Sequence, residues 1–297
     1  MGFTPASFEY RRPSTLNEAL ELMSDLSGDV RILAGGQSLI PLLKTRIASY
    51  DYLIDINGIR SLNYYVHDSD GDFYGPLYRI GSIANNDVIK ENFPSINEAA
   101  RSVADTQIRN MGTIGGNISH SDPGNDIPPV ILSLDAVITL RSKKQERRVH
   151  SPDFFYGPYE NAIGPDEILV GIEIPRLKAN TGTSFVKFRG RAREFSLSSA
   201  ASRITVDGDL RVSNAVVVLA SCLMKPTRLE EIETELMDRN LSGDVPVSAN
   251  DLKVKEDEFF YRSEVSFDYL IKVIIHTLKS SIRSAYRRAI KGVNNGA

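Results

Sequence analysis

Two glycine pairs, roughly 80 residues apart, constrain this chain more than any other feature of its sequence. The first stands in Ala34-Gly35-Gly36-Gln37-Ser38 and the second in Thr113-Ile114-Gly115-Gly116-Asn117. Each pair adjoins an apolar run, and each has a hydroxyl side chain beside it. Because glycine has no Cβ, successive backbone N–H groups can turn inward around an anion. The two pairs therefore predict two backbone cradles for one diphosphate.

Neither pair belongs to a common nucleotide-binding signature. The first lacks the Gly-Lys-Ser/Thr end of a P-loop and the third glycine of a dinucleotide-binding turn. Taken singly, each pair has an ordinary tight turn as its alternative interpretation. The matching hydroxyls and the acidic Asp-Pro segment that follows the second pair favour a ligand.

Length and composition limit the function classes. A chain of 297 residues has room for about two domains and a sizeable core. The net charge of −3 predicts no nucleic-acid partner. No apolar run reaches the roughly 18 residues of a membrane helix, and residues 1–12 lack the apolar core of a secretory signal. We therefore expect a cytoplasmic protein with no membrane span.

The sequence predicts no metal site in this chain. The single cysteine, Cys222, lies in an apolar run that indicates a core position, and it cannot by itself hold an iron–sulfur cluster. The four histidines share no metal-ligand spacing. His120 invites a general-base reading, but no serine or cysteine nucleophile stands at motif spacing, so we expect an ordinary hydrogen-bonded histidine and no catalytic residue.

Apolar periodicity and turn residues outline the elements. They predict helices over 16–26, 95–103, 228–239 and 267–290, the first two opening with capping boxes at Thr15 and Ser95. Strands are predicted at 30–34, 52–56, 136–141, 168–174, 184–189, 201–206 and 214–220, with a short turn or helix at 39–45 and a helix start at Pro128. Residues 175–183 read as a linker, so we expect domains at 1–177, with lobes 1–58 and 59–177, and at 183–291.

Several polar residues outside the glycine pairs are site candidates with competing interpretations. Asp126 precedes a proline-started helix, where it either caps the helix or accepts a hydrogen bond from a ligand hydroxyl. Asp122 and Asp126 could also bind Mg²⁺ or Ca²⁺, but two carboxylates without further acidic residues nearby supply few of the ligands that such a site needs. Phe195 is either a core residue or the cover of a flat conjugated ring. The cations of the last helix form either a solvated face or a docking surface for an acidic partner.

Four segments together carry a family resemblance. They are Ala-Gly-Gly-Gln-Ser-Leu-Ile-Pro at 34–41, Thr-Ile-Gly-Gly-Asn at 113–117, Asp-Pro-x-x-Asp-x-Pro at 122–128 and the Lys-Phe to Glu-Phe segment at 187–195. With them the sequence resembles the flavin-binding medium subunits of molybdenum hydroxylases, a group that includes carbon monoxide dehydrogenase, aldehyde oxidoreductases and the flavin part of xanthine dehydrogenase. The resemblance spans nearly the whole chain.

The resemblance implies an α+β fold, with a two-lobed FAD-binding domain of the vanillyl-alcohol-oxidase (PCMH) type and an α+β C-terminal domain with a small antiparallel sheet and helices. It implies non-covalent FAD, with Asp126 near the sugar or ribityl hydroxyls and Phe195 against the isoalloxazine. Carried over by motif, the FAD-binding residues are Ala34, Gly35, Gly36, Gln37, Ser38, Leu39, Thr113, Ile114, Gly115, Gly116, Asn117, Asp122, Asp126, Leu169, Lys187 and Phe195. Valine at Gly36 or Gly115 is then expected to leave a folded, flavin-free protein.

The resemblance also implies partners, since one cysteine and no metal site leave the molybdenum cofactor and the [2Fe–2S] clusters to other subunits. An iron–sulfur small subunit and a molybdenum large subunit are expected, in a dimer of heterotrimers. The chain is then an oxidoreductase subunit that relays electrons through FAD to an external acceptor, and the expected overall reaction is aldehyde or carbon monoxide oxidation. The alternatives are a stand-alone flavin oxidoreductase of the same fold and a non-catalytic nucleotide-binding assembly module.

Overall fold

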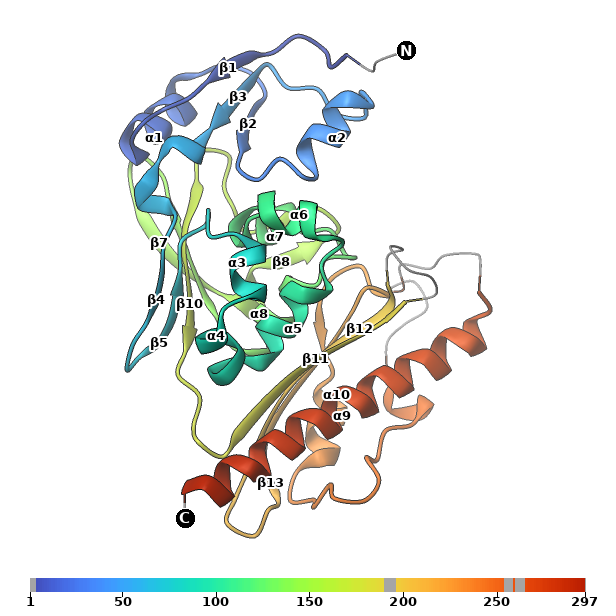
Figure 1. Cartoon of the computed structure of the whole chain (residues 1–297). Coiled ribbons are helices and arrows are strands. Elements are labelled where there is room, and N and C mark those ends of the chain that lie inside the picture. Colours follow the sequence, from blue (N-terminus) through green and yellow to red (C-terminus); the bar gives the residue numbers. More distant parts are fainter. Residues whose placement is uncertain (1–3, 190–195, 254–258, 260–264, 297) are drawn as a thin grey trace.

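The computed structural model describes residues 4–189, 196–253, 259 and 265–296. Three main sheets follow one another along the molecule, and the chain passes through them in order from the N-terminus to the C-terminus (Figure 1). Helices cover the sheets and fill the space between the second and the third. This arrangement confirms the predicted α+β fold, in which two lobes precede a C-terminal α+β region.

The N-terminal lobe is a small parallel sheet with a helix after each of its first two strands. Its strands, in the order β1-β3-β2, are β1 (Glu9–Arg11), β2 (Val30–Leu33) and β3 (Tyr52–Asp55), with α1 (Leu16–Asp25), α2 (Leu39–Lys44) and the 3₁₀ turns η1 (Ile56–Gly58) and η2 (Arg60–Leu62). The Thr15 side chain accepts a hydrogen bond from Glu18 N, which confirms one half of the first capping box, while the Glu18 carboxylate accepts from Ser14 N at 2.8 Å. The first glycine loop, residues 34–38, joins β2 to α2.

The second lobe is a five-stranded antiparallel sheet with six short helices packed on one side (Figure 1). Its strands, in the order β4-β5-β10-β6-β7, are β4 (Tyr65–His67), β5 (Gly71–Tyr74), β6 (Val137–Arg141), β7 (Glu146–His150) and β10 (Ile168–Pro175). The helices are α3 (Ile80–Ala84), α4 (Asp87–Asn92), α5 (Pro94–Ser102), α6 (Thr106–Met111), α7 (Ile114–His120) and α8 (Ile127–Ser133); η3 (Ser151–Asp153), β8 (Phe155–Gly157) and β9 (Glu160–Asn161) follow β7. The second glycine loop, residues 113–117, forms the start of α7.

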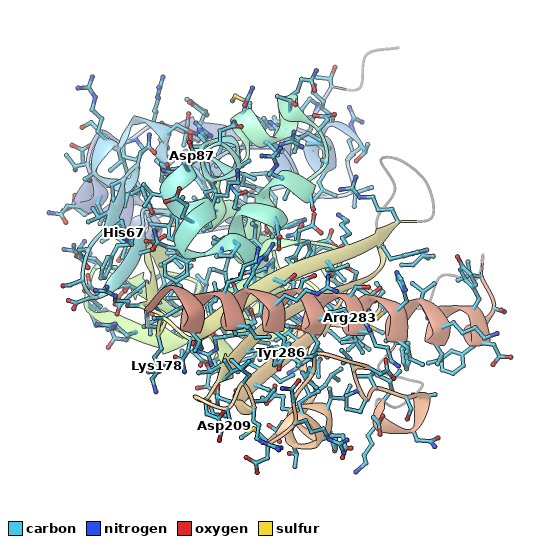
Figure 2. All side chains as sticks on the ribbon, turned by 60° about the horizontal axis from the view of Figure 1, so that its bottom comes forward. His67, Asp87, Lys178, Asp209, Arg283 and Tyr286 are labelled. Carbon is cyan, nitrogen blue, oxygen red and sulfur yellow. The ribbon has the colours of Figure 1, made fainter. Side chains whose placement is uncertain are left out.

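The C-terminal region is a four-stranded antiparallel sheet in which three strands are nine to eleven residues long. It comprises β11 (Thr181–Arg189), β12 (Ser196–Val206), β13 (Val212–Ala220) and β14 (Thr227–Arg228), with α9 (Glu230–Leu236), η4 (Ala249–Asp251) and α10 (Phe267–Gly296). The long helix α10 crosses one face of this sheet, with Arg283 and Tyr286 along its length (Figure 2). Helices α5 and α8 pack on the other face, so the C-terminal sheet shares a core with the second lobe.

The second predicted capping box is wrong, although the helix that it announced is present. Ser95 lies inside the first turn of α5, after Phe93 at the N-cap and Pro94 at the first helical position, and its buried hydroxyl oxygen has no hydrogen-bond partner. Glu98 instead accepts a hydrogen bond from Phe185 N at 2.8 Å and pairs with Arg288 of α10. The Glu98 carboxylate, which the local motif assigned to a helix cap, therefore makes tertiary contacts instead.

Among the described residues, no helix is both long and apolar enough to cross a lipid bilayer.

Candidate functional site

The first glycine loop leaves β2 and turns sharply into α2. Gly36 has a φ of +70°, a conformation that favours glycine. A Cβ on Gly35 would lie 2.4 Å from the Met111 carbonyl oxygen, so this backbone approaches the end of α6 too closely for any side chain. Figure 1 shows the same juxtaposition, with α2 on the side of the N-terminal lobe that faces α6 and α7. Both glycines are thus required by the protein itself.

The first glycine loop presents a row of free hydrogen-bond donors. Among the described residues, no acceptor receives a hydrogen bond from the backbone N–H groups of residues 35–39. Ser38 is the N-cap residue of α2, yet its exposed hydroxyl makes no capping bond. Gln37 donates from Nε2 to the Gly35 carbonyl at 3.1 Å, which stabilises the turn. An anion placed here finds several donors that no other group uses.

The second glycine loop also has a glycine pair near a hydroxyl residue, but its backbone N–H groups are hydrogen-bonded. Ile114 N donates to the Tyr78 carbonyl and Gly115 N to the Pro76 carbonyl, each at 3.0 Å. Gly116 N donates to Thr113 Oγ1 at 3.1 Å, so Thr113 caps α7. Protein acceptors thus pair with the N–H groups of residues 114–116, and the interpretation of this loop as a second backbone cradle stays a prediction.

The second glycine loop instead borders the first with small residues. A Cβ on Gly116 would lie 3.8 Å from Ala34 Cβ, across the junction of the two lobes. Asn117 Oδ1 is buried and has no hydrogen-bond partner in the described structure. This loop can therefore contribute a close wall and an acceptor, while the donors come from the first loop.

Asp126 and Lys187 form a buried ion pair that joins the second lobe to the C-terminal sheet. Lys187 Nζ lies 2.7 Å from Asp126 Oδ2, and Asp126 is only 3% exposed. Although Asp126 is the N-cap residue of α8, its side chain makes no capping bond, which removes the helix-cap interpretation. Burial raises the pKa of Asp126 to about 6, against the attraction of Lys187.

One oxygen of Asp126 remains available to a ligand. Its Oδ1 is buried and has no partner among the described residues. Asn125 Nδ2 donates to the Asn117 carbonyl at 2.9 Å, so the loop that carries Asp126 lies against α7 and the second glycine loop. Because an unpaired buried carboxylate oxygen is costly, a ligand hydroxyl that donates to it would be stabilising.

The other described site candidates already make contacts with protein groups. Asp122 is used within its own loop, where it accepts hydrogen bonds from Gly124 N at 2.8 Å and from the Tyr159 hydroxyl at 3.3 Å. The His120 ring lies against the Tyr159 ring in a tilted arrangement, and burial lowers the pKa of His120. Leu169 is a buried core residue of β10 that pairs with Leu140. Phe195 lies outside the described residues.

No group of three metal-ligating side chains gathers anywhere in the described ranges. Cys222 is buried, and burial raises the pKa of its thiol to about 12, which confirms its predicted core position.

Two residues that touch the glycine loops escaped the sequence analysis. Asn57 donates from Nδ2 to the Ala34 carbonyl at 2.7 Å, and Arg79 donates to the Met111 carbonyl. The signal for Asn57 was its position directly after a predicted strand, which read only as a turn. Arg79 gave no signal, since it lies in a segment without periodicity or motif.

The geometry agrees with comparisons to known proteins. A family model described as the FAD binding domain in molybdopterin dehydrogenase matches residues 6–177, more than half of the chain. The chain is 38% identical to the glyceraldehyde dehydrogenase medium chain of Sulfolobus acidocaldarius, over 81% of this chain and 85% of the relative. It is 31% identical to the 6-hydroxypseudooxynicotine dehydrogenase complex subunit alpha of Paenarthrobacter nicotinovorans, over 96% of each.

Solved structures extend the similarity to the whole fold. A carbon monoxide dehydrogenase from Hydrogenophaga pseudoflava, which lacks the Mo-pyranopterin moiety of its cofactor, superimposes with a TM-score of 0.89 at 28% identity, covering 96% of this chain and 99% of that chain. The chain therefore belongs to the family of FAD-binding domains in molybdopterin dehydrogenases. The predictions of an oxidoreductase subunit and of FAD as its cofactor are confirmed.

Proposed function

We propose that this chain is the flavin-carrying medium subunit of a molybdenum hydroxylase, in which electrons from a partner [2Fe–2S] subunit pass through FAD to an external acceptor. The observation that carries the proposal is the row of free N–H groups at residues 35–39, in a chain whose residues 6–177 match the FAD-binding family. When bound, FAD supplies a carrier that takes electrons from a one-electron donor and delivers them to NAD⁺, a quinone, a ferredoxin or oxygen.

The residues present fit FAD. The N–H groups of residues 35–39 and the Ser38 hydroxyl are donors for diphosphate oxygens. Asp126 Oδ1 and Asn117 Oδ1 are buried acceptors for ligand hydroxyls or amines. We propose that the remaining candidates line the same site: Ala34, Gly35, Gly36, Gln37, Leu39, Thr113, Ile114, Gly115, Gly116, Asp122, Leu169, Lys187 and Phe195.

Lys187 has a distinct task in this site. It holds Asp126 in place and supplies a positive charge in a buried environment, where burial lowers its own pKa against the attraction of Asp126. A fixed cation in a poorly hydrated site stabilises negative charge that develops nearby. We propose that Lys187 thereby favours the reduced form of the cofactor. We propose that none of the side chains in the described part of the chain acts on the organic substrate.

The names of the relatives support a multi-subunit assembly. Several are named as chains or subunits of larger complexes, including a caffeine dehydrogenase subunit beta and a carbon monoxide dehydrogenase medium chain. We propose an iron–sulfur small subunit and a molybdenum large subunit as partners, in a dimer of heterotrimers. Aldehyde or carbon monoxide oxidation would take place on the molybdenum subunit. A cytoplasmic location stays a prediction.

We also propose the domain division made from the sequence, at 1–177 and 183–291. The family match ends at residue 177, and the strand β11 that opens the C-terminal sheet begins at Thr181. Both observations support a boundary between the two.

An absorbance spectrum of the purified chain tests the function. We expect flavin bands without an iron–sulfur shoulder, and FAD as the chromophore released by acid precipitation. If the protein is colourless, added FAD should restore the bands. A chain that carries no flavin and takes up none would contradict the proposal.

A further inference from the structure

A chain of polar side chains connects the two glycine loops behind the proposed FAD site. Asn57 of η1 donates from Nδ2 to the Ala34 carbonyl at 2.7 Å, in the first loop. Arg79, the residue before α3, donates to Asn57 Oδ1 at 3.0 Å. The same guanidinium donates to the Met111 carbonyl, two residues before the second loop. One amide and one guanidinium thus link the first loop to the end of α6, which leads into the second loop.

The Asp55 carboxylate holds the Asn57 side chain in place. Asp55 Oδ1 accepts hydrogen bonds from Asn57 N at 2.9 Å and from Asn57 Nδ2 at 2.7 Å. The other oxygen of Asp55 accepts from the Tyr10 hydroxyl. The carboxylate is 8% exposed, and although burial acts to raise its pKa, the hydrogen bonds from Tyr10 and Asn57 lower it. Asp55 therefore stays ionised and keeps the Asn57 amide in one orientation.

The orientation of Asn57 determines where the first loop aims its donors. A trans peptide is planar, so its N–H points opposite to its C=O. When Asn57 holds the Ala34 carbonyl, the N–H of Gly35 in the same peptide must point away from Asn57. That N–H opens the row of residues 35–39 whose N–H groups have no acceptor in the described structure.

Arg79 sets the spacing between the loops. Gly35 lies directly against the backbone of Met111 and Gly112, where a Cβ would come within 2.4 Å of the Met111 carbonyl oxygen. An unpaired carbonyl at such a contact would be costly, and Arg79 supplies its donor. A single rigid guanidinium that binds both Asn57 and this carbonyl fixes the distance from one loop to the other.

We propose that Asn57 and Arg79 are positioning residues for FAD, which hold the two glycine loops in the one arrangement that accepts a diphosphate. The inference rests on the proposed function, since it assigns these residues to the same FAD site. It goes further because it makes diphosphate recognition depend on side chains that lie behind the loops. Neither residue needs to touch the cofactor.

The test compares FAD with riboflavin, which has the same ring system and no phosphate. The full-length chain, freed of flavin, carries Arg79→Met or Asn57→Asp, and flavin binding is titrated by fluorescence. The second variant places an oxygen against the Ala34 carbonyl with almost no change of volume. The matched control is Arg60→Met, an exposed arginine of η2. We expect FAD affinity to fall by about 10- to 100-fold in both variants, with riboflavin affinity unchanged.

The conservative variant Arg79→Lys sharpens the test. An ammonium group is a point charge that cannot bridge both acceptors as a guanidinium does, so we expect an FAD affinity between those of wild type and Arg79→Met. Equal losses for FAD and riboflavin would show a general structural role and overturn the proposal, as would full FAD affinity in both variants. A wild-type chain that binds no FAD would instead overturn the proposed function.

Discussion

The two glycine loops have nearly the same sequence pattern and opposite hydrogen-bonding states. In the first, the N–H groups of residues 35–39 have no acceptor among the described residues. In the second, the N–H groups of Ile114, Gly115 and Gly116 all donate to protein oxygens. A glycine pair beside a hydroxyl therefore specifies a close backbone approach and leaves open what is approached. In the second loop the approaching group is the protein.

The difference has a local cause. The second loop runs beside residues 76–79, whose carbonyls lie within reach of its N–H groups, and Arg79 and Thr113 form a β-bridge. The first loop follows the last residue of β2, where the pairing with β3 has ended at Asp55. No neighbouring strand supplies acceptors there, so the donors remain free for a ligand.

The largest expected effect is a loss of folding stability on substitution in the second glycine loop. A Cβ on Gly115 would lie 2.5 Å from Pro76 Cβ and 2.8 Å from the Pro76 carbonyl oxygen. Gly115→Val should therefore lower the free energy of unfolding by about 3 kcal/mol, measured by urea denaturation of the flavin-free chain. This result would replace the expectation of a folded, flavin-free variant. Gly208→Val, with no atom within 4 Å of its Cβ, is the control. Wild-type stability in Gly115→Val would contradict the packing argument.

The second effect is the pH dependence of folding stability that Asp126 causes. The pKa of Asp126 is about 6 in the folded chain, above the ordinary 3.8. The folded state thus binds this proton more tightly, and the stabilisation is complete below about pH 4 and lost as the pH rises through about 6. It corresponds to about 3 kcal/mol at most.

Denaturation at several pH values checks this contribution. We expect Asp126→Asn to remove most of the decline in stability between about pH 4 and 7 that the carboxyl causes. Asp209→Asn, an exposed change in a turn, should keep the wild-type profile. An unchanged profile in Asp126→Asn would place the titration elsewhere.

The third effect tests the first loop. Gly36→Ala puts a Cβ at a φ of +70°, which costs about 1–2 kcal/mol, while its nearest contact is the mobile end of Ile40. We expect a folded chain whose FAD affinity falls about tenfold, because relief of the strain turns the free N–H groups away from the diphosphate. Gly243→Ala, which meets no atom within 4 Å, serves as control in the same titration. Equal FAD affinity in both variants would argue against the cradle.

The smallest effect compares the two hydroxyls. Thr113 caps α7, so Thr113→Ala should lower the free energy of unfolding by about 1 kcal/mol. Ser38 makes no capping bond, so Ser38→Ala should leave stability unchanged and weaken FAD binding severalfold. Thermal unfolding and FAD titration of both variants give a matched pair. Equal losses of stability would erase the distinction between the loops.

Much of the fold was predictable because it depends on local pattern. The apolar spacing of residues 16–26 and the capping box at Thr15 fixed α1, which spans Leu16–Asp25. Strand β12 begins at Ser196, five residues before the predicted start. Its first half is rich in small serines that lack an apolar signal and are buried only because α10 and the second lobe cover both faces of the sheet.

The candidate site also has a part that follows from the local sequence and a part that depends on tertiary contacts. The sequence by itself determined where the backbone can approach another group without a side chain, since that depends on glycine, and it excluded a cysteine-based metal centre. Only the tertiary structure decided which N–H groups stay free, that Lys187 reaches Asp126 and that Asn57 and Arg79 join the loops. The physical reason is that a hydrogen bond depends on what lies opposite in space, and these partners come from strands and turns distant in the chain.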